Sequence, residues 1–132
     1  MKTVGLITEY NPFHNGHLYH IERARELTGA DRVVIVMSGD YVQRGTPALL
    51  SKHSRAHMAL LNGASAICEL PVCYASGSAE SFAQGASLFW KVWDASIHYA
   101  LEVNAESFLF YSILHSCFSP NQILTAICFR MH

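Results

Sequence analysis

Residues 3–17 read TVGLITEYNPFHNGH and set the pattern for the first half of the chain. The apolar run Thr3–Thr8 has the length and β-branched content of a strand, and the turn-forming segment Glu9–Gly16 comes directly after it. A helix is predicted over His17–Thr28, ended by Gly29. Its apolar residues lie on one helical face, at Leu18, Ile21, Ala24 and Leu27. The stretch therefore predicts a β-strand, a loop and an α-helix in that order.

The same alternation continues to residue 70. Arg32–Met37 (RVVIVM) is a nearly continuous apolar run, as expected for a parallel strand that is buried on both faces. A second helix is predicted over Ser51–Asn62 and a third strand over Ala66–Leu70. Strands separated by helices favour a parallel sheet, because parallel neighbours need a crossover connection that is usually helical. The predicted fold class is α/β, with a doubly wound parallel sheet.

The loop after the first predicted strand is the main candidate for a binding site. Ligands of doubly wound sheets lie beyond the carboxyl ends of the strands, where a loop meets the N-terminus of a helix. His14, Gly16 and His17 stand at this point. Gly16 would let a base or ribose lie against the backbone, and the imidazoles would donate to phosphates beside the free N–H groups of the helix. The alternative is that both histidines are surface residues and Gly16 is merely part of a turn.

The sequence around this loop resembles a known family. HNGH at residues 14–17 resembles the HIGH signature of the nucleotidyltransferases that transfer adenylyl groups. Longer segments are similar to the bacterial tRNA(Met) cytidine acetate ligase family: TEYNPFHNGH (8–17), MSGDYVQRGTPALL (37–50), KHSRAHMALLNGA (52–64) and ELPVCYASGSAESFAQGA (69–86). The resemblance covers residues 1–86 almost without a gap.

The resemblance implies a Rossmann-like nucleotidyltransferase domain and an ATP-dependent ligase. Members of the family activate acetate with ATP to acetyl-adenylate, and then acetylate N4 of the wobble cytidine of elongator tRNA(Met). ATP with Mg²⁺ is the implied cofactor, and no metal site built by the protein itself is expected. The implied catalytic residues are His14 and His17. The implied ATP-binding residues are Ile7, Thr8, Glu9, Tyr10, Asn11, Pro12, Phe13, His14, Asn15, Gly16, His17, Leu18, Tyr19 and His20.

Polar residues that come after the second strand belong to the same predicted sheet edge. Ser38-Gly39-Asp40 and Gln43-Arg44-Gly45 lie there, so Ser38 or Arg44 would meet ATP or RNA unless the segment is an ordinary polar loop. Lys52 and Arg55 are three positions apart on one helix face. One interpretation is that both side chains contact phosphates, and the alternative is that they belong to a helix face exposed to solvent.

Four other residues have two interpretations each. Glu69, at the end of the third strand, would orient a base or a metal-bound water, or would cap a neighbouring helix. His20 is either a neighbour of the ligand or a polar residue on the outer face of its helix. Cys68 and Cys73 are expected to be small buried residues rather than reactive thiols.

Composition limits the class of protein. The chain has 132 residues, 51% of them hydrophobic and 14% charged, with a net charge of -1, which excludes disorder or a basic nucleic-acid tail as the main theme. The N-terminus lacks the profile of a secretory signal, and the cysteines show no CxxC spacing. Reduced thiols and a cytoplasmic location are therefore expected. The cysteines are Cys68, Cys73, Cys117 and Cys128.

The composition changes near residue 86. Residues 1–86 contain 14 of the 19 charged residues, whereas residues 87–132 contain five of them together with nine of the 15 aromatic residues. No charged residue occurs from Ser107 to Phe129, but no membrane span is expected there because polar residues would lie at its centre at a cost of several kcal/mol. These are His115, Pro120, Asn121 and Gln122.

Reading the codons of this tail from their third bases indicates a change of reading frame near Ala86-Ser87. In the shifted frame, Trp90-Lys91 forces Glu, Trp93-Asp94 forces Gly and His98-Tyr99 forces Leu. The junctions from Asp94 to Glu106 permit, in order, the residues of GCVDSLCFGSECG, a pattern typical of the family at this place. Residues 87–132 are thus interpreted as an out-of-frame tail, the alternative being a divergent tail that agrees by chance.

The frame change predicts a truncated enzyme. The sheet would stop after three strands, with an open apolar edge that residues 87–132 were not selected to cover. Part of the ATP pocket and the tRNA-binding region of the family would be missing. We therefore expect residues 1–86 to form the N-terminal part of a nucleotidyltransferase domain without transfer activity. The alternatives are a non-catalytic pseudogene product that binds nothing, or another small-molecule adenylyltransferase, since HxGH does not specify the acceptor.

Overall fold

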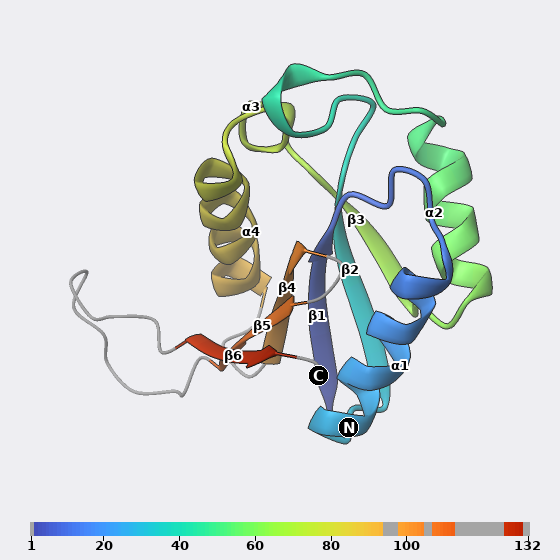
Figure 1. Cartoon of the computed structure of the whole chain (residues 1–132), viewed down its shortest axis with the longest axis vertical. Coiled ribbons are helices and arrows are strands. Elements are labelled where there is room, and N and C mark those ends of the chain that lie inside the picture. The colour runs from blue at the N-terminus through green and yellow to red at the C-terminus, as the bar shows by residue number, and fades with distance from the viewer. Residues whose placement is uncertain (1, 94–97, 105–106, 113–125, 131–132) are drawn as a thin grey trace.

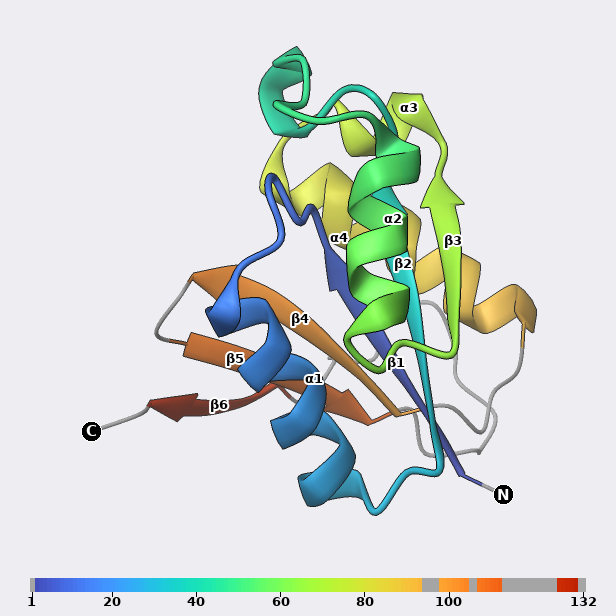
Figure 2. The ribbon, with the colours of Figure 1, turned by 90° about the vertical axis from the view of Figure 1, so that its right-hand side faces the viewer.

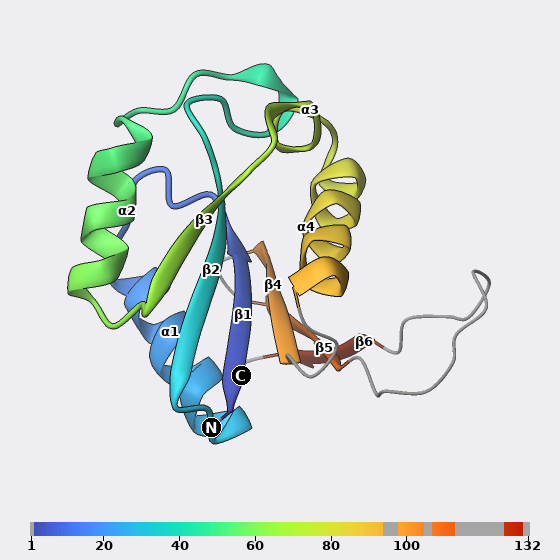
Figure 3. The same cartoon turned by 180° about the vertical axis from the view of Figure 1, so that it is seen from behind.

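Helices cover both faces of a central sheet in the computed structural model of this chain (Figure 1). The structure describes residues 2–93, 98–104, 107–112 and 126–130. The strand order is β3-β2-β1-β4-β5-β6. Helices α1 and α2 lie on one face and α3 and α4 on the other, as Figures 2 and 3 show from two further sides. The fold is α/β with a Rossmann-like parallel arrangement of its first strands, as predicted.

The three strands predicted from apolar runs are present and parallel. They are β1 (Thr3–Thr8), β2 (Arg32–Ser38) and β3 (Ala66–Leu70). Thr3 pairs with Arg32 in the β1–β2 register, and Val34 pairs with Ala66 in the β2–β3 register. Parallel pairing aligns the carboxyl ends of all three strands at one edge, where the loops after β1 and β2 emerge.

Helix boundaries are set by local capping. Helix α1 spans Asn15–Thr28 and begins two residues before the predicted start, because His14 is its N-cap. Gly29 ends it with a φ of 62°, a conformation that glycine adopts without strain. Helix α2 spans Lys52–Leu61 behind the N-cap Ser51. The remaining helices are the 3-10 turn η1 (Gln43–Gly45), α3 (Val72–Ala75) and α4 (Ala79–Trp93).

Two apolar cores lie on opposite faces of the sheet. One joins α1 and α2 to β1 and β2, with Ile21, Ala24 and Ala59 packed against strand residues such as Leu6 and Ile35. The other joins α3 and α4 to the opposite faces of the same strands. Its buried residues are Ile7, Val34, Val36, Leu70, Ala75, Phe82, Ala86 and Trp90.

The sheet does not end after three strands, and our expectation of an open edge at β1 was wrong. Strand β4 (His98–Asn104) pairs in parallel with β1, and β5 (Ser107–Ser112) and β6 (Ala126–Arg130) continue the sheet in antiparallel fashion. An unpaired strand leaves a row of N–H and C=O groups without partners, so a neighbouring extended segment pairs with it readily. The topology changes direction at β1, since β2 and β4 lie on its two sides.

Helix α4 runs without a break across the compositional boundary at Ala86. Trp90 is only 1% exposed and packs against β1, where a Cβ on Gly5 would lie 2.6 Å from its ring. Phe82, Ala86 and Trp90 recur at spacings of four, which places all three on the buried face of the helix. Residue 90 therefore contributes to the core, although it lies beyond Ala86.

Some of the residues discussed in the sequence lie outside the part that the structure describes. Residues 94–97, 105–106 and 113–125 are outside it, and they include Cys117 and most of the run without charged residues. In the part of the chain that the structure describes, no helix is long and apolar enough to cross a membrane.

Candidate functional site

The loop between β1 and α1 lies at the carboxyl edge of the sheet. It runs from Glu9 to the N-cap His14 and delivers the chain to the N-terminus of α1 (Figure 2). Strand β1 is also where the strand order changes direction, and open α/β sheets bind ligands in the crevice at that position. The fold therefore places the predicted loop where such folds bind ligands.

His14 and His17 form a reciprocal cap at the start of α1. The Gly16 N–H donates to His14 Nδ1 at 3.1 Å, and the His14 N–H donates to His17 Nδ1 at 3.1 Å. The two rings stack with centroids 3.7 Å apart. A neutral imidazole that accepts at Nδ1 carries its proton on Nε2. Both Nδ1 atoms therefore act as acceptors in the cap.

Gly16 lies against the side chain of His14 in this cap. A Cβ at position 16 would lie 2.9 Å from Cε1 of the His14 ring, so a side chain there would displace the imidazole. The cap therefore gives a structural reason for glycine at this position, and the predicted contact of its backbone with a base or ribose stays a prediction.

Two aromatic side chains, Tyr10 and Phe13, pack against His17 of the histidine pair. Tyr10 is buried and its ring centroid lies 4.7 Å from that of His17, while Phe13 lies 4.9 Å from Tyr10 and 5.6 Å from His17. His17 is itself buried, whereas His14 is exposed. His20 is buried on the inner side of α1, so the interpretation of His20 as an outer-face residue was wrong.

A polar group at the end of β1 faces the same region of the fold. Thr8 is the last residue of β1 and is 2% exposed, and its hydroxyl has no hydrogen-bond partner among the residues that the structure describes. A buried hydroxyl without a partner is costly, so it marks a place where a polar ligand or water gains a hydrogen bond. This observation fits a polar ligand at the carboxyl end of β1.

A second loop, residues 39–50, holds the first one in place. Glu9 Oε1 accepts the Gln43 N–H at 2.8 Å, and Asn11 Oδ1 accepts the Leu49 N–H at 2.7 Å. These bonds join segments that are 34 and 38 positions apart in the chain. The path of the first loop therefore depends on the second.

Arg55 lies beneath both loops and is completely buried. Its guanidinium donates to the carbonyl oxygens of Leu50 (3.1 Å), Glu9 (2.5 Å), Ser38 (3.2 Å) and Gly39, and to the hydroxyl of Ser38. Burial lowers the pKa of Arg55, and the carboxylates of Asp40, Glu9 and Glu69 act in the opposite direction. Arg55 belongs neither to a solvated helix face nor to a surface that phosphates reach, so both sequence interpretations of Arg55 were wrong.

Lys52, one turn before Arg55, makes an exposed ion pair. Its Nζ lies 3.0 and 2.9 Å from the two carboxylate oxygens of Glu69 and 3.8 Å from Asp40. The hydrogen bond with Glu69 raises the pKa of Lys52. The described contacts of the Glu69 carboxylate are with this lysine, and the helix-capping role proposed for it is not observed among them.

The other candidates fall at different depths. Ser38 is buried in contact with Arg55, and Arg44 is exposed with a φ of 63°. Cys68 is half-buried, and burial raises the pKa of its thiol. Cys73 is exposed, contrary to expectation. Among the described residues, no group of three or more His, Cys, Asp or Glu side chains is placed to hold a metal ion.

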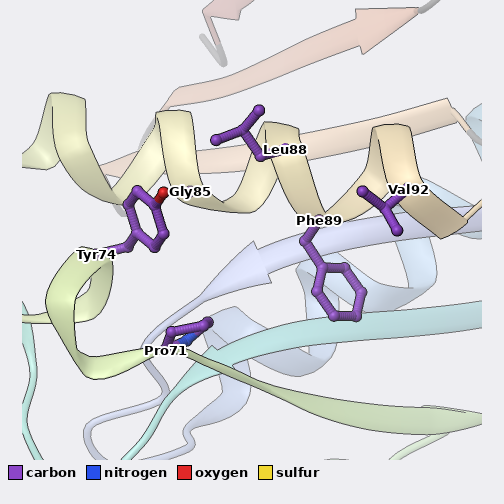
Figure 4. Close-up of a pocket in the computed structure, with 6 residues that line it drawn as sticks. All are labelled: Pro71, Tyr74, Gly85, Leu88, Phe89 and Val92. Carbon is purple, nitrogen blue, oxygen red and sulfur yellow. The ribbon is translucent and has the colours of Figure 1, made fainter.

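An apolar cavity of about 550 Å³ lies on the opposite face of the sheet (Figure 4). It is separate in sequence from the loop after β1 and has few polar groups, so it offers no chemistry for a charged nucleotide. Its lining residues come from α3 with its N-cap Pro71 and from α4, and they are Pro71, Tyr74, Gly85, Leu88, Phe89 and Val92.

Sequence reasoning missed the part played by Arg55. Most of its partners are backbone carbonyl oxygens, one of them 46 positions away, which no local pattern reveals. One signal was present, because Arg55 shares a helical face with Ala59, a residue of the core. An arginine on the apolar face of a helix is expected to be buried and fully bonded.

Known proteins match the part of the chain that contains this loop. The HIGH Nucleotidyl Transferase family matches residues 1–109. The tRNA(Met) cytidine acetate ligase of Caldicellulosiruptor saccharolyticus is 60% identical over 86 residues, which are 65% of this chain and 22% of that protein. The Clostridium tetani protein of the same name is 58% identical over 87 residues, 66% of this chain and 22% of its own length.

Solved structures give a similar match. Thermotoga maritima TmcAL bound with alpha-thio ATP is 51% identical with a TM-score of 0.64, covering 67% of this chain and 21% of that one. The apo form of the same protein matches equally well. The chain spans about a fifth of the length of these relatives.

Proposed function

The chain belongs to the HIGH nucleotidyl transferase family, and we propose from this premise that its loop Thr8–His17 and the N-terminus of α1 bind ATP. The observation that carries the proposal is the histidine cap, in which the Nδ1 atoms of His14 and His17 accept backbone N–H groups at the N-terminus of a helix. Phosphates are favoured there by the helix dipole and by N–H groups that have no partner within the helix. A relative that is 51% identical binds an ATP analogue, which supports the same ligand here.

Residues 7–20 divide into two groups in this proposal. Ile7, Tyr10 and His20 are buried, so they would support the site from the core of the domain. His14 is exposed and would contact the nucleotide directly, while His17 would act from the inner side of the cap. The Thr8 hydroxyl would supply a further hydrogen bond at the end of β1.

The chemistry proposed for the family is the activation of acetate. A carboxylate oxygen of acetate attacks the α-phosphorus of ATP, pyrophosphate leaves, and the acetyl group is then transferred to N4 of a tRNA(Met) cytidine with release of AMP. His14 and His17 would stabilise the charge that develops on the phosphate oxygens, because their donors are already oriented by the cap. Mg²⁺ would enter with the nucleotide and neutralise part of its charge.

The short chain itself is proposed to carry only the first part of this machinery. Relatives align over 86 or 87 residues, a length that supports a change of frame near Ala86, although the family match continues to residue 109. The chain has nine Lys and Arg residues and a net charge of -1, a composition that does not favour a basic surface of the size that tRNA requires. Residues 87–132 are proposed to be an out-of-frame tail of a cytoplasmic enzyme.

An acetylation assay tests this division. The purified chain is incubated with ATP, labelled acetate and tRNA(Met), beside a full-length protein in which the frame is restored. Label should enter tRNA with the restored protein only, because transfer needs all reactants positioned together, an effect worth about 7–11 kcal/mol. Label in tRNA with the short chain would overturn the proposal that it lacks transfer activity.

The alternatives give different results in the same experiment. A pseudogene product that binds nothing would neither bind ATP nor transfer acetate. Another small-molecule adenylyltransferase would release pyrophosphate in the restored protein without labelling tRNA.

A further inference from the structure

Arg55 lies outside the loop assigned to ATP, yet the geometry points to it as the positioning residue of that loop. We propose that its guanidinium fixes the loop after β1 against the loop after β2, and so sets the arrangement that a nucleotide meets. The proposal rests on the proposed ATP-binding function of the first loop. It adds a residue that touches neither phosphate nor acetate.

The contacts of Arg55 join three separate segments. Nε donates to Leu50 at the end of the second loop, one Nη to Glu9 in the first loop, and the other Nη to Ser38 and Gly39 at the end of β2. The Ser38 hydroxyl takes the remaining N–H. A guanidinium has five N–H donors in a rigid plane, and each of them has an acceptor here. The planar fork therefore fixes the relative positions of its partners.

Glu9 links Arg55 to the rest of the first loop. Its carbonyl is held by Arg55, its carboxylate accepts the Gln43 N–H, and the next residue, Tyr10, has a φ of 49°. Positive φ is unfavourable for tyrosine and needs support from its surroundings. Tyr10 in turn packs against His17. A chain of contacts thus leads from Arg55 to the histidine cap.

The five acceptors around Arg55 suit the shape of a guanidinium. All five of its bonds go to carbonyl or hydroxyl oxygens, while the carboxylates of Asp40, Glu9 and Glu69 favour its charge without a hydrogen bond to it. Lysine would keep the positive charge but replace the planar guanidinium and its five donors with a single ammonium group. Arg55→Lys therefore tests the geometry of the side chain rather than its charge.

Amide hydrogen exchange on the whole 132-residue chain measures the clamp directly. The informative N–H groups are those of Gln43 and Leu49, which bond to Glu9 and Asn11 across the two loops. Arg25→Lys is the matched control, since Arg25 also donates to a carbonyl, that of Gly63 at 2.8 Å. In Arg55→Lys these two amides should exchange about tenfold faster while Val34 and Val36 in β2 change little, because the opening is local.

Equal acceleration in the loops and in β2 would indicate a merely structural role and overturn the proposal, as would unchanged exchange at Gln43 and Leu49. If Arg55→Lys does not fold, hydrogen exchange of the arginine side chains in the wild-type chain tests the clamp instead. The N–H protons of the Arg55 side chain should exchange far more slowly than those of exposed Arg23, and equal rates would contradict the clamp.

Titration with ATP separates this inference from the proposed function. The wild-type chain should bind ATP, Arg55→Lys should bind it about tenfold more weakly and Arg25→Lys should match the wild type. Failure of the wild type to bind ATP would defeat the proposed function, while the exchange rates would still decide whether Arg55 clamps the loops. Equal ATP affinity in Arg55→Lys and the wild type would overturn the positioning role.

Discussion

The carboxyl edge of the sheet and the face covered by α4 are held by different kinds of interaction. At the edge, Arg55, Glu9 and Asn11 make directional hydrogen bonds between side chains and backbone. At the face, Trp90 fills the space over Gly5 by apolar contact. Directional bonds need particular residues, whereas apolar packing needs a side chain of suitable size.

This difference explains why the two regions respond differently to the proposed change of frame. Every residue that builds the edge lies before Ala86, within the part that resembles the ligases. The face is completed by Trp90, from beyond that boundary. A helix can therefore continue across the boundary with new residues as long as an apolar one returns to the buried side, but a new sequence does not recreate a hydrogen-bonded loop.

The largest expected effect concerns the apolar face. Trp90→Ala should lower the free energy of unfolding by about 3–5 kcal/mol, because it leaves a cavity against β1. Val92→Ala, at a residue that is 89% exposed, is the control and should change stability by about 0.5 kcal/mol or less. Urea unfolding measures both variants. Equal stability of the two would show that residue 90 does not pack onto the sheet.

A second prediction uses the two cysteines near β3. Burial raises the pKa of Cys68 and limits access to its thiol, whereas Cys73 is exposed. Alkylation followed by peptide mapping should show Cys73 reacting about tenfold faster. The difference should disappear in guanidinium chloride, where burial is lost. Faster reaction at Cys68 in the folded chain would contradict the position of β3.

The smallest effect is expected at the N-cap of α2, beside the edge. Ser51 accepts the Ser54 N–H at 3.2 Å, and Ser51→Ala should cost about 1 kcal/mol. Ser51→Asp keeps an acceptor and should retain most of the wild-type stability. Thermal unfolding distinguishes them. If both variants lost the same stability, the hydroxyl would have another role.

The strands and the place of the site could be predicted from local sequence. Continuous apolar runs give Thr3–Thr8 and Ala66–Leu70 with their observed ends. The start of α1 was placed late because histidine rarely serves as an N-cap, and only the tertiary position of His14 and His17 creates the reciprocal cap.

The remaining features depend on contacts between distant residues. The buried Arg55 bonds to carbonyl groups of two loops and the end of β2, and the pairing of β4 with β1 joins segments that are far apart in the chain. Neither has a local signature in the sequence. The close approach of Gly16 to the His14 ring also has no signature in the sequence.

Calorimetric titration of the chain with ATP tests the central claim, that the histidine cap binds the nucleotide. His14→Ala and His17→Ala should each weaken ATP binding by about 1–3 kcal/mol, the range for a hydrogen bond to a charged group. His14→Asn retains an N-cap acceptor and should still bind more weakly than the wild type, because it lacks the imidazole donor. His53→Ala, at an exposed histidine of α2, should bind as the wild type does. Unchanged ATP affinity in both His14→Ala and His17→Ala would contradict the account.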